Sequence, residues 1–307
     1  GRHIELGISE MNLFMMLSMM GLSKELTGVH LVPVGTVYDP FVCRGLDALI
    51  YGLYSGSKFI FAGTPSGVTL SPEGGSHQST VTPSLGTELP NLDYWEPCFA
   101  LELKWIMLEA IRQCCDRAAG RSTYLRLSTK PVDQGLMNAA LKRLGEDALR
   151  AQVLAGACRL RDWRDGGMTD AAAPLVFLAA AGALVPEAME AAAMLEKEGV
   201  RVNVLGVSSP RRLYGQWQAA LARERQGQAG QGLLEELMPP EERRAPIVTV
   251  QDGASHSLAW LGSVFGVRAA SLGVDRFGQA GSRADLYGHF GIDAAGIAEA
   301  AFSLLEA

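Results

Sequence analysis

The chain has 307 residues, of which 48% are hydrophobic and 20% are charged, a composition typical of a globular protein long enough for two domains. A formal net charge of −6, without a long run of Lys or Arg, excludes the basic surface expected of a nucleic-acid-binding protein. No apolar stretch approaches the roughly 20 residues that a membrane-spanning helix requires, so we expect no membrane association.

The number and spacing of the cysteines bear on the redox state of the compartment in which the protein works. There are five, an odd number, and they show neither Cys-x-x-Cys spacing nor a neighbouring pair of histidines. This pattern predicts buried free thiols rather than a disulfide framework or a zinc site, and so a protein of the reducing cytoplasm.

Short runs rich in β-branched residues alternate with longer helical stretches, which predicts parallel sheets covered by helices. The elements expected in the first half are a helix over 10–24 with Ser9 as its N-cap, strands over 30–37 and 58–62, a helix over 41–55, a loop over 63–86, a helix over 97–118 and a strand over 123–128.

Residues 130–170 are of mixed charge and contain Gly166-Gly167, which predicts a linker with a short helix over 138–144. The pattern then resumes, with strands over 174–180, 200–205 and 246–251 and helices over 185–198, 256–265 and 294–305. The fold class is therefore α/β, with two doubly wound, mostly parallel-sheet domains over residues 1–145 and 146–307. Because Gly1-Arg2-His3 opens directly onto a folded element, we expect further strands of the first domain upstream.

Three features of the first half indicate chemistry. Glu10 stands in the first turn of the first helix, where an isolated acid is more often a partner of the helix dipole than a catalyst. Tyr38 and Phe41 lie three residues apart, a separation that lets both rings contact one flat ligand, although each alone would more often be a core residue. His77 lies in a Gly-rich loop, which favours function over packing.

The run from Glu5 to Asn12 resembles the strand-to-helix junction of the pyrimidine-binding domain in the transketolase and 2-oxo acid dehydrogenase superfamily. Residues 274–283 and the stretch His289-Phe290-Gly291-Ile292-Asp293 resemble the C-terminal domain of the homodimeric, bacterial-type pyruvate dehydrogenase component. The resemblance extends from Gly7 to Ala307. It implies a transketolase-like pyrimidine-binding domain followed by a transketolase C-terminal-like domain.

The resemblance also implies roles for particular residues. Glu10 would be the acid that activates thiamine diphosphate, and His77 would donate or accept a proton at the reacting carbonyl. Ile8, Glu10, Tyr38 and Phe41 would contact the aminopyrimidine ring. For Asp275, Arg283 and His289 we expect domain packing, since that domain does not ordinarily supply catalytic groups.

Departures from the family pattern bear on the substrate. A transketolase acting on sugar phosphates would carry a His, an Asp and an Arg where this chain has Thr64, Glu73-Gly74 and Thr129-Lys130, which favours a 2-oxo acid. The loop between Glu73 and His77 is shorter than in pyruvate dehydrogenases and lacks a further His, which leaves the substrate open.

The metal-binding Gly-Asp-Gly of the family, followed about thirty residues later by Asn, has no counterpart. The ligands of Mg²⁺ and of the diphosphate are therefore expected outside this chain, and no metal-binding residue is assigned within it.

The expected function is oxidative decarboxylation of a 2-oxo acid, above all pyruvate, by a thiamine diphosphate- and Mg²⁺-dependent oxidoreductase. The acyl group would pass to a lipoyl group on the acyltransferase of a multienzyme complex, and the enzyme would be a homodimer. Two alternatives remain: transketolase-type transfer of a two-carbon ketol unit between sugar phosphates, and a non-catalytic fragment that lacks the diphosphate-binding domain.

Overall fold

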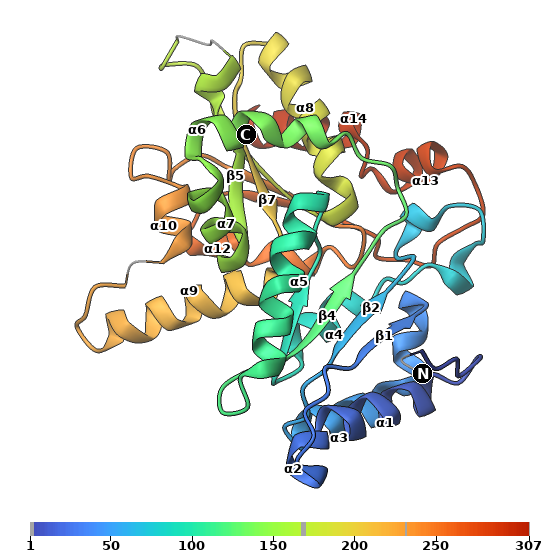
Figure 1. Cartoon of the computed structure of the whole chain (residues 1–307). Coiled ribbons are helices and arrows are strands. Elements are labelled where there is room, and N and C mark those ends of the chain that lie inside the picture. The colour runs from blue at the N-terminus through green and yellow to red at the C-terminus, as the bar shows by residue number, and fades with distance from the viewer. Residues whose placement is uncertain (1–2, 167–169, 231, 307) are drawn as a thin grey trace.

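Two separate sheets organise the chain in the computed structural model, which describes residues 3–166, 170–230 and 232–306 (Figure 1). The first sheet is parallel throughout, in the order β1-β2-β4-β3. Its strands are β1 (Val34–Val37), β2 (Ile60–Gly63), β3 (Leu92–Trp95) and β4 (Ser122–Arg126). Strands β2, β3 and β4 are buried along their whole length, as expected for a parallel sheet covered on both faces.

The second sheet has the order β5-β7-β6-β8-β9, and only β5 runs antiparallel to its neighbour. Its strands are β5 (Ala157–Arg161), β6 (Leu175–Ala181), β7 (Arg201–Val207), β8 (Ile247–Val250) and β9 (Ala269–Leu272). The predicted α/β class with two mostly parallel sheets is confirmed. The predicted boundary between residues 145 and 146 falls between the two sheets and stays a prediction.

Helices cover both faces of each sheet. Those of the first half are α1 (Glu10–Gly21), α2 (Ser23–Thr27), α3 (Leu46–Tyr54), α4 (Thr82–Glu88), α5 (Ala100–Cys115), α6 (Asn138–Leu144) and α7 (Glu146–Ala155). Those of the second half are α8 (Val185–Lys197), α9 (Pro210–Arg225), α10 (Leu233–Leu237), α11 (His256–Ala259), α12 (Leu261–Val264), α13 (Arg283–Phe290) and α14 (Ala294–Glu306). In this described part of the chain, no helix has the length and apolar character needed to cross a membrane.

The core has three parts. On one face of the first sheet, α1 and α3 pack through Phe14 and Leu49. On its other face, α5 belongs to a core that continues without a break into α8 and α14 of the second domain. The far face of the second sheet is covered by the helices α9 to α12. Because one apolar core runs through both domains, the two sheets are held in a fixed relation.

Several predicted elements differ from the structure. The expected linker over 130–170 contains α7 and the edge strand β5, so that prediction was wrong there, although the short helix over 138–144 is confirmed as α6. The expected strand over 30–37 is reduced to β1; Pro33, which has no N–H to donate to a ladder, immediately precedes it. Ser9 precedes α1 but its side chain forms no cap hydrogen bond. All five cysteines are free, as predicted, but the expected burial holds only for Cys114 and Cys158; Cys98 is partly buried, and Cys43 and Cys115 are exposed.

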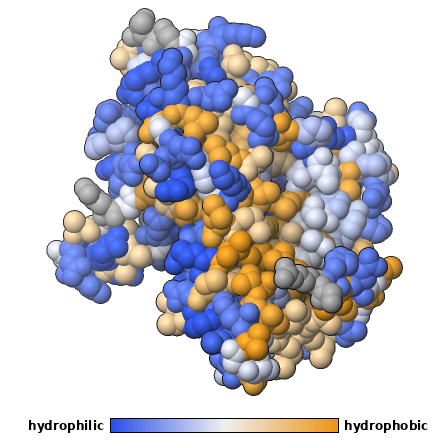
Figure 2. All heavy atoms as spheres, in the orientation of Figure 1, coloured by the Kyte–Doolittle hydropathy of each residue, from blue (hydrophilic) through white to orange (hydrophobic). Residues whose placement is uncertain are grey.

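One face of the first domain carries exposed apolar side chains. Figure 2 shows them over β1, an edge strand, and the segment before it. The exposed residues there are Val29, Leu31, Val32 and Val34, and α1 adds Met11, Met15 and Met19. Apolar groups gathered in this way, beside an unpaired strand edge, mark a surface that another chain can cover.

Candidate functional site

Three rings predicted from the sequence come together where β1 ends. The ring centroids of Tyr38 and Phe41 are 5.5 Å apart with an interplanar angle of 32°. The imidazole of His77 stands edge-on to both, 5.8 Å from Tyr38 and 5.7 Å from Phe41. Tyr38 follows β1 directly, whereas His77 arrives from a 3-10 helix (Gly75–His77) 39 residues from Tyr38 along the chain. The aromatic pair and the histidine are therefore one cluster, at the carboxyl end of a parallel strand, where α/β proteins commonly bind ligands.

Glu10 joins this cluster through an arginine that the sequence analysis missed. The Glu10 side chain is only 13% exposed, and its Oε1 lies 3.6 Å from a guanidinium nitrogen of Arg44. The same guanidinium lies over the ring of Phe41, 3.7 Å from its centroid. Arg44 follows Phe41 by three residues in the 3-10 helix Asp39–Gly45, and this spacing was the available signal. Arg44 thus links the carboxylate of Glu10 to the aromatic pair.

A buried aspartate fixes the aromatic pair. Asp39 is fully buried directly after Tyr38, and its carboxylate accepts hydrogen bonds from Thr82 (2.7 Å), Ser79 and Tyr124. Arg126, at the end of β4, adds an ion pair of 3.0 Å. Burying a carboxylate is costly unless its oxygens are fully paired, and here they are. The turn that displays Tyr38 and Phe41 is thereby anchored to the interior.

The loop that leads toward His77 is held by the second domain. The carboxylate of Asp252, just after β8, accepts the backbone N–H groups of Val68 (2.8 Å) and Thr69 (2.9 Å). Gly67 has φ +64°, and a Cβ on it would lie 2.1 Å from an oxygen of Asp252. Only glycine permits both this backbone conformation and this close approach. Asp252 therefore holds the loop to the second domain.

His77 itself keeps one ring nitrogen free. Its Nδ1 lies 3.0 Å from the hydroxyl oxygen of Ser76, and Nε2 has no partner among the described residues. Its neighbour Gln78 is buried and donates to the carbonyls of Ser71 and Gln279, both at 2.9 Å. The backbone carrying the imidazole is thus fixed, while Nε2 is available for proton transfer.

Two positions compared above with a sugar-phosphate clamp are already engaged. Glu73 accepts a hydrogen bond of 2.5 Å from the Tyr38 hydroxyl; burial, together with this bond, raises the pKa of Tyr38 to about 12. The ammonium group of Lys130 pairs with the carboxylate of Glu187 and donates to the carbonyl of Ala183 at 2.9 Å. Neither side chain offers an unpaired positive charge to a phosphate.

Ile8 lies on the outer side of the site and is 88% exposed. No group of three or more His, Cys, Asp or Glu side chains that could hold a metal ion occurs within residues 3–166, 170–230 and 232–306. The described part of the chain thus presents a carboxylate, an aromatic pair and an imidazole.

The C-terminal residues Asp275, Arg283 and His289 lie in or beside the elements of the second domain. Asp275 accepts the backbone N–H of Ser255 at 2.8 Å. The ring of His289 packs edge-on against Phe290, at 4.9 Å between centroids. Arg283 begins α13. The adjoining backbone presses on the loop of His77, because a Cβ on Gly75 would lie 2.3 Å from the carbonyl oxygen of Gly278.

Known proteins with similar sequences indicate a superfamily for this chain. Residues 167–293 match the transketolase-like TK C-terminal domain. The whole chain is 27% identical to the chromosomal transketolase of Cupriavidus necator, of which it covers 39%. The pyruvate dehydrogenase E1 component of the same bacterium is 23% identical over 87% of this chain and 29% of the relative. The chain spans about two fifths of the length of the transketolases it matches.

Solved structures show the same fold. A transketolase variant from Pichia stipitis has a TM-score of 0.66 at 18% identity, over 89% of this chain and 34% of that one. A split-gene transketolase, solved as an inactive β4 tetramer, has a TM-score of 0.66 at 20% identity, over 98% of this chain and 83% of that one. These matches support the transketolase superfamily. They do not confirm the narrower resemblance to pyruvate dehydrogenase, whose matches are weaker.

Proposed function

We propose that this chain supplies the pyrimidine-facing half of a thiamine diphosphate-dependent enzyme that transfers a two-carbon ketol unit, as transketolases do. The observation that carries the proposal is the convergence of Glu10, Tyr38, Phe41 and His77 at the end of β1. Similarity to transketolases along the whole chain supports the ketol-transfer chemistry over the oxidative decarboxylation favoured by the sequence motifs.

The residues of the cluster fit the aminopyrimidine half of the cofactor. Tyr38 and Phe41 provide a partly exposed aromatic wall for a flat ring. Glu10, mostly buried beside that wall, would hold a proton on its carboxyl oxygen in a hydrogen bond to a ring nitrogen. His77 would donate a proton from Nε2 to the carbonyl oxygen of the substrate and later take it back. The bound cofactor supplies the electron sink.

A second chain, or another part of a longer one, would complete the site. The described residues hold no cluster of metal-binding side chains for Mg²⁺ and the diphosphate. Ile8, Met11 and Met15 are exposed around Glu10 and offer an apolar surface that such a chain would bury. The split-gene transketolase in the comparison assembles as a tetramer, which supports assembly here, with homodimer formation as the simplest arrangement.

A second candidate is the decarboxylation of a 2-oxo acid such as pyruvate, with acyl transfer to a lipoyl-bearing acyltransferase. It is favoured by one observation: Lys130 is neutralised by Glu187, and Thr64 and Glu73 carry no positive charge. A substrate without a phosphate would not need those positions to be basic. Under both candidates, Glu10 and His77 keep the same roles.

The Glu10→Gln variant tests the proposal in an assembly that contains the diphosphate-binding half. A glutamine of the same shape holds no ionisable proton, so we expect turnover to fall about 10²- to 10⁴-fold while the fold is retained. The matched control is Glu5→Gln, whose side chain is 87% exposed and five residues away. That variant should keep full turnover. Near-normal turnover in Glu10→Gln would remove the assignment.

Two assays on the unmodified protein, in the same assembly with the diphosphate-binding half, separate the candidates. Ketol transfer between a ketose and an aldose acceptor, with and without phosphate groups, measures the first reaction. Release of carbon dioxide from pyruvate with an artificial electron acceptor measures the second. Transfer without pyruvate decarboxylation supports the transketolase-type function; the reverse result supports the second candidate. Absence of both would leave a non-catalytic role.

A further inference from the structure

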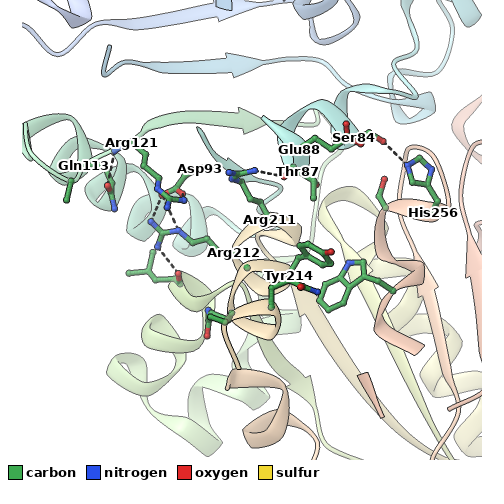
Figure 3. A pocket seen from close by; sticks show the side chains of 18 residues that line it. Ser84, Thr87, Glu88, Asp93, Gln113, Arg121, Arg211, Arg212, Tyr214 and His256 are labelled. Atoms are coloured by element: carbon green, nitrogen blue, oxygen red, sulfur yellow. Dashed lines mark hydrogen bonds and ion pairs between the residues drawn. The ribbon is translucent and has the colours of Figure 1, made fainter. Parts of the chain in front are cut away.

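A cavity lies between the two domains, away from the cluster around Tyr38. It has a volume of about 1020 Å³ and is lined by α4, β3 and the residue before β4 on one side and by α9 and α11 on the other (Figure 3). Tyr38 follows the carboxyl end of β1, whereas Arg121 precedes β4 at the amino end of the same parallel sheet. The cavity is therefore at the opposite edge of the sheet from the candidate site. Its size and its place between domains are typical of small-molecule sites.

Three arginines project into this cavity, and Arg212 among them pairs with Glu109 at 3.1 Å as well as with Asp93. Asp93 accepts hydrogen bonds from Arg212, at 3.2 Å to Nε, and lies 3.7 Å from a guanidinium nitrogen of Arg121. Arg211 forms no ion pair in the part of the chain that the structure describes; its guanidinium donates to the carbonyl of Thr87. One arginine is thus left with a neutral acceptor beside two others (Figure 3).

Buried hydrogen-bonding atoms without partners gather in the same place. Nε of Arg211, Nε1 of Trp260 and Oγ of Ser257 are buried without a hydrogen-bond partner, and all three residues line the cavity. The two nitrogens can only donate. Buried donors are nearly always paired in folded proteins. In this conformation the three atoms are shielded from the cavity, so an acceptor bound there would reach them only after their side chains turn toward it. An oxyanion offers several acceptor oxygens at once.

The surroundings of Arg211 also act against its positive charge. Burial, and after it the like charge of Arg121, lower the pKa of Arg211. A dianionic group beside both guanidinium groups would reverse this effect. Guanidinium groups suit phosphate because their planar donors match its oxygens in pairs.

An aromatic wall completes the cavity. The ring of Tyr214 is edge-on to Trp260 at 5.1 Å between centroids, and both line the space. Trp217 stacks on Trp260 at 5.2 Å with an interplanar angle of 19° and fixes its orientation. Rings held in this way provide a surface for a flat, partly apolar group.

We propose that this cavity binds a small organic phosphate that carries a flat ring. Its phosphate would lie between Arg121 and Arg211, and its ring against Tyr214 and Trp260. The ligand belongs to the chemical class of nucleoside monophosphates. The site is separate from the one proposed for thiamine diphosphate and does not depend on that proposal.

Calorimetric titration of the full chain with adenosine monophosphate, inorganic phosphate and adenosine tests the proposal. We expect saturable binding of the nucleotide, at least tenfold weaker binding of inorganic phosphate and the weakest binding of adenosine. Arg211→Gln should weaken nucleotide binding at least tenfold, and Trp260→Leu should remove the advantage over inorganic phosphate. The control is Arg150→Gln, an exposed arginine on α7, which should leave binding unchanged.

Thermal unfolding provides an independent measurement. Arg211→Gln removes a hydrogen bond to the carbonyl of Thr87 together with an unpaired buried donor, so the melting temperature of the ligand-free protein should change little, which shows that the variant folds. The nucleotide should raise the melting temperature of the unmodified protein and not that of the variant. No saturable nucleotide binding, or equal binding by Arg211→Gln, would overturn the proposal. Equal affinity for inorganic phosphate would overturn it as well, since the ring would then contribute nothing.

Discussion

The contact region between the two domains, here called the seam, consists of buried ion pairs around Arg126. The aromatic cluster beside it consists of partly exposed rings. In the seam, Arg126 is 2% exposed and donates to Asp39, Glu96 and the backbone carbonyl of Asp252. In the cluster, Tyr38, Phe41 and His77 are partly exposed, and one nitrogen of His77 has no partner in the described chain. In the seam, charged groups have a full set of hydrogen-bond partners and support the site. In the cluster, partly exposed groups keep unpaired hydrogen-bonding atoms, and these are available to a ligand.

The largest expected effect comes from breaking the seam. Burial alone would lower the pKa of Arg126, but the carboxylates of Glu96 and Asp39 raise it, so the guanidinium stays charged. Arg126→Met would leave both carboxylates buried without their cation and should lower the free energy of unfolding by about 3 to 5 kcal/mol. Urea unfolding measures the loss.

The control for that variant is Arg112→Met. Arg112 is 60% exposed and pairs with Glu109 three residues earlier in α5. Exposed pairs of this kind contribute about 1 kcal/mol or less. If Arg126→Met and Arg112→Met lower the free energy of unfolding equally, the buried ion pairs of the seam stabilise the fold no more than an exposed pair does.

Sequence patterns predicted most of the fold because burial in a parallel sheet leaves a strong signal. Buried strands such as β6 appear as continuous apolar runs, and long helices such as α8 show regular apolar spacing. The strands β3, β5 and β9 and the helix α9 were missed. In β5 the sequence is Ala-Cys-Arg-Leu-Arg, whose charged side chains form ion pairs only in the folded chain. Arg159, for example, pairs with Asp162 and Glu242.

The candidate site was predictable only in part, for a related reason. Tyr38 and Phe41 lie only three residues apart, so their spacing in the sequence predicted that they act together. In the sequence Asp39 resembles any acidic turn residue, because its hydrogen-bond partners belong to the distant elements α4 and β4. Asp252 likewise binds the backbone of Val68, which is 184 positions away in the chain. Contacts of such separation leave no local pattern, and neither residue was predicted.

A medium effect should come from a buried acid that does not belong to an ion pair. Glu102 accepts the backbone N–H groups of Cys98 (2.8 Å) and Phe99 (3.1 Å) at the start of α5. Burial outweighs these bonds and raises the pKa of Glu102 to about 7, from an ordinary value of 4.5. The folded state therefore holds this proton more tightly than the unfolded chain does. The stability that it contributes is present below pH 4.5 and is lost as the pH rises through 7.

Glu102→Gln tests this assignment, because an amide of the same shape cannot ionise. The unfolding free energy of the unmodified protein should fall by up to about 3 kcal/mol between pH 4.5 and pH 8 as a result of this residue. The variant should lose that component and show a flatter profile in the same interval. Glu88→Gln, an exposed acid at the end of α4, is the control and should leave the profile unchanged. An unaltered slope in Glu102→Gln would assign the titration to another group.

The smallest effect is expected in the cluster itself. Tyr38→Phe removes a hydroxyl whose partner, Glu73, is exposed and can be hydrated by water instead, so the free energy of unfolding should change by no more than about 0.5 kcal/mol. Tyr124→Phe is the matched variant in the seam. It removes a hydroxyl that donates to the fully buried Asp39, and should cost about 1 to 3 kcal/mol. Parallel urea titrations compare the two. Equal losses would mean that the cluster contributes to stability as the seam does, and the distinction between a supporting region and a ligand-facing region would no longer hold.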